Sequence, residues 1–267
     1  MSLLELVNLH KTFEKGTVNE NHVLRGLDLT IEDGDFISVI GGNGAGKSTL
    51  LNCIAGLIPI DQGTITLDNQ SITKDSVEKR SKDISRVFQD PRMGTATNLT
   101  IEENMAIAHK RGNKRHIFRQ SVTDDDRQLF KKSLSQLGLG LENRMKTDAA
   151  FLSGGQRQAL TLAMATLVRP KLLLLDEHTA ALDPKTSDMV MELTQKVIEE
   201  QRLTALMITH NMEHAIAYGN RLVMLYHGKI VVDVKGEAKR NLTVAELMEL
   251  FHKNSGQQLI DDALVLG

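Results

Sequence analysis

The stretch Gly41-Gly42-Asn43-Gly44-Ala45-Gly46-Lys47-Ser48 decides the fold of this 267-residue chain. It follows the apolar run 36–40, which predicts a strand buried on both faces, and it opens 47–57, whose apolar spacing predicts a helix. A glycine-rich turn between a buried strand and a helix N-terminus lets successive backbone N–H groups converge on phosphate oxygens. The sequence therefore predicts a nucleoside-triphosphate site on a parallel α/β sheet, where Lys47 bridges phosphate oxygens and Ser48 binds Mg²⁺.

The rest of the chain also alternates apolar strands with helical patterns. Strands are expected at 3–9, 22–31, 63–68, 84–88, 171–175, 204–208, 221–226 and 229–234, and helices at 154–168, 184–201 and 211–217. Residues 101–138 have a mostly helical pattern, so we expect a helical subdomain at about 90–165 that is inserted into the core. The expected domain spans 1–240, and a short helical tail follows at 241–267, with Thr243 as a possible helix cap.

Composition narrows the class of protein. Lys and Arg number 32 and Asp and Glu 34, so the formal net charge is −2 and no global basic field is available for nucleic acid. The single cysteine, Cys53, excludes an intramolecular disulfide and indicates a reducing compartment. No apolar run approaches the ~18 residues of a membrane span, and the first residues lack the pattern of a secretory signal. We therefore expect an intracellular chain that does not cross the membrane and has no nucleic-acid partner.

The most basic segment is 109–119, which holds five Lys or Arg and no acidic residue. A solvated loop between helices is the favoured interpretation, and contact with a partner or with lipid headgroups is the alternative. Nucleic-acid binding is less favoured, because the acidic residues 124–126 follow and Phe118 is the only aromatic available for stacking.

Two acidic residues end the apolar run 172–175. In a parallel sheet this strand end lies beside the phosphate loop, so Asp176 is expected to hold the metal through water. Glu177 is expected to polarise the water that attacks the γ-phosphate, a contribution of ~10² to 10⁴ in rate. The next residue, His178, is interpreted as a tolerated loop variation in preference to a titratable neighbour of Glu177.

A third motif, Leu152-Ser153-Gly154-Gly155-Gln156, precedes the predicted helix 154–168. Ser153 is predicted to cap this helix, which leaves N–H groups that could face an anion. By itself the stretch would fit an ordinary capped helix.

In this order and spacing, the three motifs resemble those of the ATPase subunits of ATP-binding cassette (ABC) systems, and the resemblance covers about residues 3–235. It implies an α/β fold with a P-loop NTPase (RecA-like) parallel-sheet core, an N-terminal antiparallel β subdomain and an inserted helical subdomain. It also implies ATP hydrolysis, with ATP and Mg²⁺ as cofactors. Since two cassettes of this family dimerise head to tail around ATP, Ser153 and Gly155 would face the γ-phosphate held at Lys47 of a second copy.

The resemblance implies roles for single residues as well. Gln89 matches the glutamine that touches Mg²⁺ and the attacking water, and His210 the histidine that contacts the γ-phosphate. Asp183 matches the loop that couples the two sites across the dimer. Phe13 matches the aromatic that stacks on adenine, with a core position as the alternative. The expected sets are catalytic Glu177, His210, Gln89 and Lys47; nucleotide-binding Phe13, Gly41, Gly42, Asn43, Gly44, Ala45, Gly46, Lys47, Ser48 and Thr49; signature Leu152, Ser153, Gly154, Gly155 and Gln156; dimer-coupling Asp183; and metal-binding Ser48, Gln89 and Asp176.

The resemblance predicts a transporter energy subunit at the cytoplasmic face of the membrane. Its implied partners are a second copy of the chain, transmembrane permease subunits and, indirectly, an extracytoplasmic substrate-binding protein. The motifs lean toward importers of amino acids or similar small solutes, although they do not name the solute. A single-cassette ATPase that acts in cofactor assembly or regulates a membrane-bound partner is the alternative. A GTPase or small-molecule kinase is disfavoured, because the guanine motif Asn-Lys-x-Asp is absent and 152–156 would be unexplained.

Overall fold

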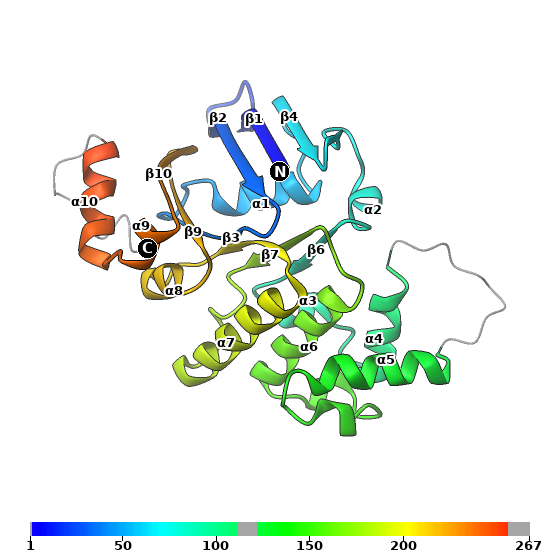
Figure 1. Ribbon diagram of the computed structural model, residues 1–267. Helices are drawn as coiled ribbons and strands as arrows, with labels where there is room; N and C mark the ends of the chain where they lie inside the picture. The colour runs from blue at the N-terminus through cyan, green and yellow to red at the C-terminus, as the bar shows by residue number, and fades with distance from the viewer. Residues whose placement is uncertain (1, 112–121, 256–267) are drawn as a thin grey trace. The chain divides into compact units, whose positions relative to one another are not determined.

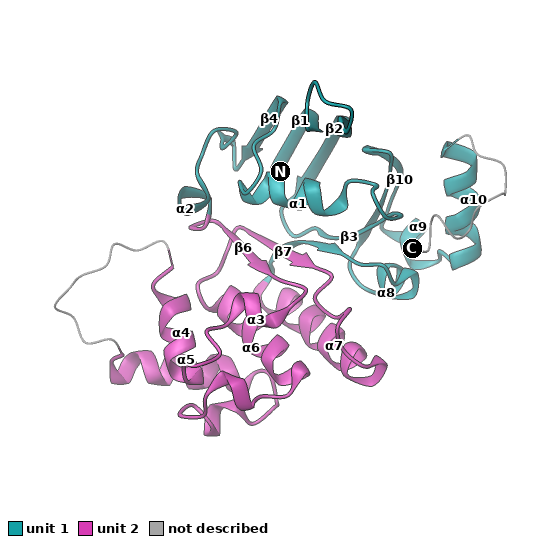
Figure 2. Cartoon of the chain, turned by 180° about the vertical axis from the view of Figure 1, so that it is seen from behind, with its two compact units in different colours: residues 1–80, 202–267 teal, residues 81–201 magenta. Residues whose placement is uncertain are grey.

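The computed structural model describes residues 2–111 and 122–255, and it mixes strands with helices (Figure 1). The chain divides into two compact units, which Figure 2 colours separately. Unit 1 comprises residues 1–80 and 202–267, and unit 2 comprises residues 81–201. Within the described ranges we find no helix with the length and apolarity that crossing a bilayer requires.

An antiparallel sheet forms the first layer of unit 1, with its strands in the order β2-β1-β4-β5. Their bounds are β1 Ser2–Phe13, β2 Asn21–Glu32, β4 Gln62–Leu67 and β5 Gln70–Ser71. Alternate apolar side chains, among them Leu4, Leu6 and Leu29, are buried while their neighbours are more exposed. This alternation is what gives the sheet one packed face and one outer face.

The strand that leads to the phosphate loop, β3 (Phe36–Ile40), is buried along its whole length. It pairs in parallel with β8 (Thr204–Ile208) and with β9 (Arg221–Tyr226). The predicted parallel arrangement is thereby confirmed for these strands. The next strand, β10 (Lys229–Lys235), is antiparallel to β9, because the intervening His227 and Gly228 form a tight turn with positive φ at both residues and leave no room for a crossover.

Helix α1 (Lys47–Ala55) follows the phosphate loop and ends at Gly56, whose φ of 81° provides the left-handed cap. Arg80, at the end of α2 (Val77–Arg80), donates hydrogen bonds of 2.8 Å from Nη1 to the carbonyl oxygens of Cys53 and Ile54. These bonds satisfy the last carbonyls of α1, so a residue far along the chain holds the helix that starts at the candidate site.

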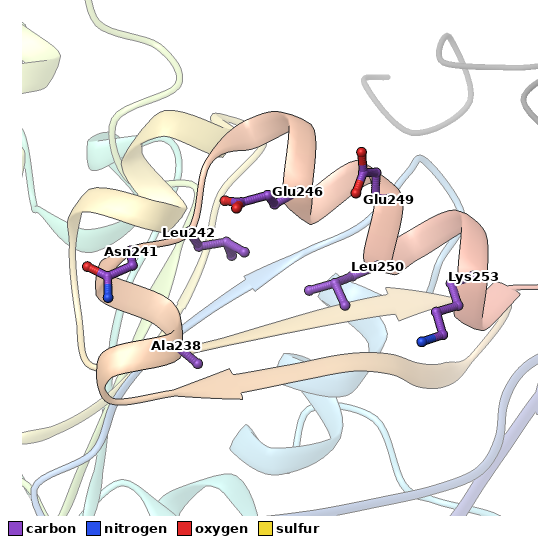
Figure 3. Close-up of a pocket in the computed structure, with 7 residues that line it drawn as sticks. All are labelled: Ala238, Asn241, Leu242, Glu246, Glu249, Leu250 and Lys253. Atoms are coloured by element: carbon purple, nitrogen blue, oxygen red, sulfur yellow. The ribbon is translucent and has the colours of Figure 1, made fainter.

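The C-terminal part of unit 1 contains α8 (Met212–Ala217), α9 (Glu237–Arg240) and α10 (Val244–Ser255). Leu247 and Phe251 of α10 are buried against Met212 and Ala215 of α8. A pocket of about 430 Å³ lies between α9 and α10, and it is lined by Ala238, Asn241, Leu242, Glu246, Glu249, Leu250 and Lys253 (Figure 3). The packing of α10 on α8 supports the helix that follows His210.

Unit 2 contains the parallel pair β6 (Ile84–Val87) and β7 (Leu172–Asp176). Its helices are α3 Pro91–Gly94, α4 Ile101–His109, α5 Asp124–Ser135, α6 Gly154–Leu167 and α7 Pro184–Gln201, with 3₁₀ turns η1 Leu141–Asn143 and η2 Ala149–Phe151. The basic segment 109–119 lies outside the described residues from position 112 onward. The boundaries predicted for the helical subdomain, the domain and the tail stay predictions.

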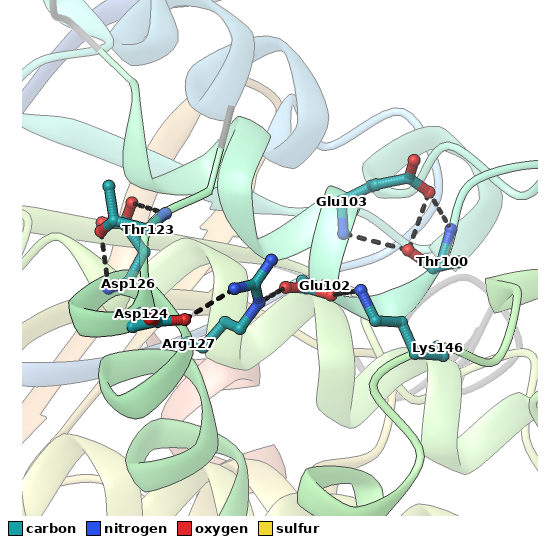
Figure 4. A network of polar contacts seen from close by, with 8 residues as sticks. All are labelled: Thr100, Glu102, Glu103, Thr123, Asp124, Asp126, Arg127 and Lys146. Atoms are coloured by element: carbon teal, nitrogen blue, oxygen red, sulfur yellow. Dashed lines mark hydrogen bonds and ion pairs between the residues drawn. The ribbon is translucent and has the colours of Figure 1, made fainter. Parts of the chain in front are cut away.

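A buried carboxylate links α4 to α5 (Figure 4). Glu102, which is 3 % exposed, accepts a hydrogen bond from Arg127 Nε and forms an ion pair with Lys146. Burial by itself would raise the pKa of Glu102, but Lys146 and Arg127 outweigh it and hold this pKa below its ordinary value. The ion pairs of Glu102 with Arg127 and Lys146 therefore require an ionised Glu102.

Candidate functional site

The phosphate loop begins where β3 ends, and its backbone requires glycine. At Gly41, where φ is 150°, a Cβ atom would lie 2.3 Å from the carbonyl oxygen of Leu225. Gly46, with φ of 104°, immediately precedes the first residue of α1. A side chain would clash with the backbone at Gly41 and would be strained by the positive φ at Gly46, so this path of the loop requires glycine at both positions.

Lys47 is 5 % exposed and lies folded over this loop. Its Nζ atom donates hydrogen bonds to the carbonyl oxygens of Gly41, at 2.6 Å, and of Gly42, at 3.1 Å. Ser48 and Asn43 are exposed, and Thr49 is half-buried. The loop therefore presents a cation, a hydroxyl and backbone donors together, which fits a triphosphate with its metal ion.

His210 lies at the same sheet edge as the start of the loop. Val39 of β3 is in register with Ile208 of β8, and the N–H of Thr209 donates to the carbonyl oxygen of Val39. His210 comes next in the chain and is exposed, and Asn211 caps α8 behind it through His214 N–H. Unit 1 thus places at one sheet edge the phosphate loop and His210, the histidine predicted to contact the γ-phosphate.

Phe13 is half-buried at the end of β1, and the Nζ atom of Lys11 lies 5.4 Å from the centre of its ring. Asp61 holds this strand end, because its carboxylate accepts from the N–H of Thr12 and from Lys11. Burial would raise the pKa of Asp61, but these hydrogen bonds and the lysine charges lower it. The stacking role of Phe13 on adenine stays a prediction.

In unit 2 the two parallel strands bring Gln89, Asp176 and Glu177 to one edge. Val87 of β6 is in register with Leu175 of β7, so the residues that follow each strand emerge side by side. Gln89 is exposed, and the carbonyl oxygen of the preceding Phe88 accepts a hydrogen bond from Gln158. The oxygen donors of Gln89 and Asp176 are of the type that Mg²⁺ prefers.

The sequence analysis missed Arg86, whose guanidinium forms an ion pair with the carboxylate of Asp176. Arg86 faces Leu174 in the register of the two strands, and Asp176 follows two residues later on the same face. An arginine in a strand that begins and ends with apolar residues was the available signal, but its partner became visible only through strand pairing.

Glu177 has a φ of 46°, a left-handed conformation that costs a non-glycine residue about 1 kcal/mol. Its carbonyl oxygen accepts from the N–H of Ala180, which closes a turn directly after β7. His178 is buried, and its Nε2 atom lies 3.0 Å from the hydroxyl of Thr194, which itself donates to the carbonyl oxygen of Val190. Because that hydroxyl has only one proton, His178 donates to it, so its ring is bound to α7.

The predicted cap at Ser153 is confirmed. The Ser153 hydroxyl accepts from the N–H of Gln156, and the Gln156 side chain accepts from the N–H of Ser153, which forms a capping box at the start of α6. Ser153 and Gly154 are exposed, whereas Leu152 is buried. The motif therefore presents a capped helix N-terminus at the surface of unit 2.

Asp183 lies next to this helix start. The chain around it packs on the motif, since a Cβ at Gly154 would lie 3.1 Å from Leu182 and one at Gly155 would lie 2.4 Å from Thr186. Asp183 is exposed, and hydrogen bonds from Thr186 at the start of α7 lower its pKa. The close approach explains glycine at position 155.

Comparison with known proteins identifies the family of the chain. The sequence model of the family described as "ABC transporter" matches residues 24–180 of this chain. The tyrosine transport ATP-binding protein of Clostridioides difficile is 46 % identical over 252 residues, covering 93 % of this chain and 98 % of that protein. An aliphatic sulfonates import ATP-binding protein of Agrobacterium fabrum is 36 % identical, with 89 % and 81 % covered. A dimeric ATP-binding cassette in a post-hydrolysis state, bound to ADP and Pi, has a TM-score of 0.73 at 29 % identity and covers 87 % of this chain and 98 % of its own.

Proposed function

Because the chain belongs to the ATP-binding cassette (ABC) transporter family, we propose that it energises uptake of an amino acid or similar small solute through a separate permease. The chain is an ATP-binding and ATP-hydrolysing subunit of this family. The observation that carries the chemistry is the glycine loop with the buried Lys47 folded over it. The solute class rests on the 46 % identity with a tyrosine transport protein over nearly the whole of both chains.

In the proposed reaction the backbone N–H groups of residues 41–49 bind the β- and γ-phosphates of ATP. Lys47 exchanges its bonds to the carbonyl oxygens of Gly41 and Gly42 for phosphate oxygens, and Phe13 stacks on the adenine. This exchange requires no new ordering of Lys47, because its side chain is already held over the loop.

Hydrolysis is assigned to the residues that follow the parallel strands. Ser48, Asp176 and Gln89 are the proposed ligands of Mg²⁺, which when bound neutralises charge on the phosphate oxygens. Glu177 accepts the proton of the attacking water, and His210 contacts the γ-phosphate. Since Glu177 is held in a left-handed turn, its carboxylate position depends on the backbone as well as on its rotamer.

The proposed working form is a head-to-tail dimer with ATP between the copies. The capped N-terminus of α6 at Ser153 and Gly155 would then face the phosphates bound by the partner, and Asp183 would couple the two sites. The dimer acts on transmembrane permease subunits from the cytoplasmic face of the membrane. An extracytoplasmic substrate-binding protein delivers the solute.

Affinity purification of the tagged chain from detergent-solubilised native membranes tests this assignment. We expect a polytopic permease and a substrate-binding protein among the proteins identified by mass spectrometry. Uptake of radiolabelled tyrosine and of other amino acids by cells with and without the chain then tests the solute class. A purely soluble set of partners would contradict the transport role and favour a cassette that acts in cofactor assembly.

A further inference from the structure

The ion pair between Arg86 and Asp176 supplies the proposed metal-binding carboxylate with a cation from the chain itself. The two side chains are 13 % and 15 % exposed, so water solvates the pair only in part. They extend from adjacent parallel strands, with Arg86 in register with Leu174 and Asp176 two residues beyond it. The pairing is therefore fixed by the backbone of the sheet.

The same guanidinium also contacts the segment that carries Gln89. Its Cζ atom lies 4.9 Å from the centre of the Phe88 ring, at cation–π distance. The carbonyl oxygen of Phe88 accepts a hydrogen bond of 3.2 Å from Gln158, which is 1 % exposed on α6. Arg86 is thus in contact with one proposed metal ligand and with the residue directly before another.

A cation in this place has a defined electrostatic consequence. A divalent ion that approaches Asp176 encounters a carboxylate whose charge is already partly balanced, together with repulsion from the guanidinium. Without the guanidinium, the half-buried carboxylate would be uncompensated until the metal binds. The charge of Arg86 should therefore set how much Mg²⁺ is needed to fill the site.

We propose that Arg86 is the built-in counter-ion of Asp176, which positions this carboxylate before the metal binds and weakens the affinity of the site for the divalent cation. The inference rests on the proposed function, because it takes Asp176 as a metal-binding residue. It assigns Arg86 a positioning role and no direct part in the reaction.

The test is a titration of Mg²⁺ into the 267-residue chain with a non-hydrolysable ATP analogue, in which the melting temperature is measured at each Mg²⁺ concentration. The variant Arg86→Met should reach half-saturation at about tenfold lower Mg²⁺ than the unsubstituted chain, because one repelling charge has been removed. Arg86→Lys keeps the charge and should stay within about twofold. Mn²⁺ binding can be measured by electron paramagnetic resonance without ATP hydrolysis. The metal affinities of the three proteins should rank in the same order as with Mg²⁺.

A matched control separates this role from ordinary stabilisation. Arg221 also forms ion pairs between elements, with Asp233 of β10 and with Asp35, and its side chain is 11 % exposed. Arg221→Met should lower the melting temperature and leave the Mg²⁺ dependence unchanged. If Arg86→Met does not fold, Arg86→Gln removes the same charge with a polar side chain and should also tighten Mg²⁺ binding.

An unchanged or weaker Mg²⁺ affinity in the charge-removing variants would overturn the counter-ion role. If Mg²⁺ and the analogue raise the melting temperature of neither the unsubstituted chain nor Arg86→Met, the proposed nucleotide and metal site itself is wrong. The two failures therefore give different results in the same experiment.

Discussion

The Nζ atom of Lys47 donates a hydrogen bond of 2.6 Å to the carbonyl oxygen of Gly41, the first residue of the loop that it closes. A second bond of 3.1 Å reaches Gly42, and the lysine is nearly inaccessible to solvent. The cation is therefore kept in place by the same loop whose N–H groups are proposed to bind the phosphates. The loop and its lysine act as one preorganised unit.

Lys47→Ala should weaken ATP binding by at least about tenfold, because charge-assisted hydrogen bonds to phosphate oxygens are lost. Titration with a fluorescent ATP analogue measures this affinity. Lys79→Ala is the control, since Lys79 is an exposed lysine that forms an ion pair with Asp75, four residues before it in the sequence. Tight binding by Lys47→Ala would contradict the assignment of the loop as the phosphate site.

Glu177→Gln should retain ATP binding and lower the hydrolysis rate by about 10² to 10⁴, because the amide cannot accept the proton of the attacking water. Gln preserves the size of the side chain at a position where φ is 46°, so the turn should be retained. Phosphate release under single-turnover conditions measures the effect. The control is Glu192→Gln, at an exposed position of α7, which should hydrolyse ATP at the normal rate. Normal turnover by Glu177→Gln would refute the general-base role of Glu177.

Ser153→Arg should bind ATP but fail to dimerise, because a long cation would occupy the exposed helix N-terminus that is proposed to face the partner's phosphates. Ser153→Ala is the control for the added cation, because it removes the capping hydroxyl without placing a long side chain there, and it should cost about 1 kcal/mol of stability. Dimer formation is measured by light scattering in the Glu177→Gln background with ATP. An ATP-dependent dimer of Ser153→Arg with normal affinity would disprove the trans arrangement.

Acidification should destabilise unit 2 through Glu102. Its pKa is lowered in the folded chain, so its contribution is fully present above the unfolded value of about 4.3 and is lost as the pH falls through the folded pKa. Glu102→Gln should lower the free energy of unfolding by about 2 kcal/mol at pH 7 and by much less at pH 3. Urea unfolding at both pH values measures this difference, with Glu192→Gln as the exposed control. An equal loss at both pH values would show that the charge of Glu102 is not responsible.

Local patterns were sufficient for three strands and one helix, whereas the helix predicted at 47–57 ends two residues earlier, at Ala55. The predicted strands at 36–40, 204–208 and 221–226 and the helix at 184–201 agree with β3, β8, β9 and α7 at both ends. The four-residue helices α2, α3 and α9 were missed, since a single turn has no periodicity to detect. The antiparallel direction of β10 was also missed, although its tight turn at Gly228 indicates a hairpin.

The sequence by itself determined the family, the phosphate loop and the candidate site residues, because short motifs keep their chemistry within a few neighbouring positions. The roles of these residues stay predictions that the variants above test. Only the tertiary structure decided that Arg86 pairs with Asp176, 90 positions apart, and that Arg80 caps α1. Such contacts depend on strand register and on packing between segments that are distant in the chain. A local sequence pattern does not predict which distant residue will lie next to a given side chain.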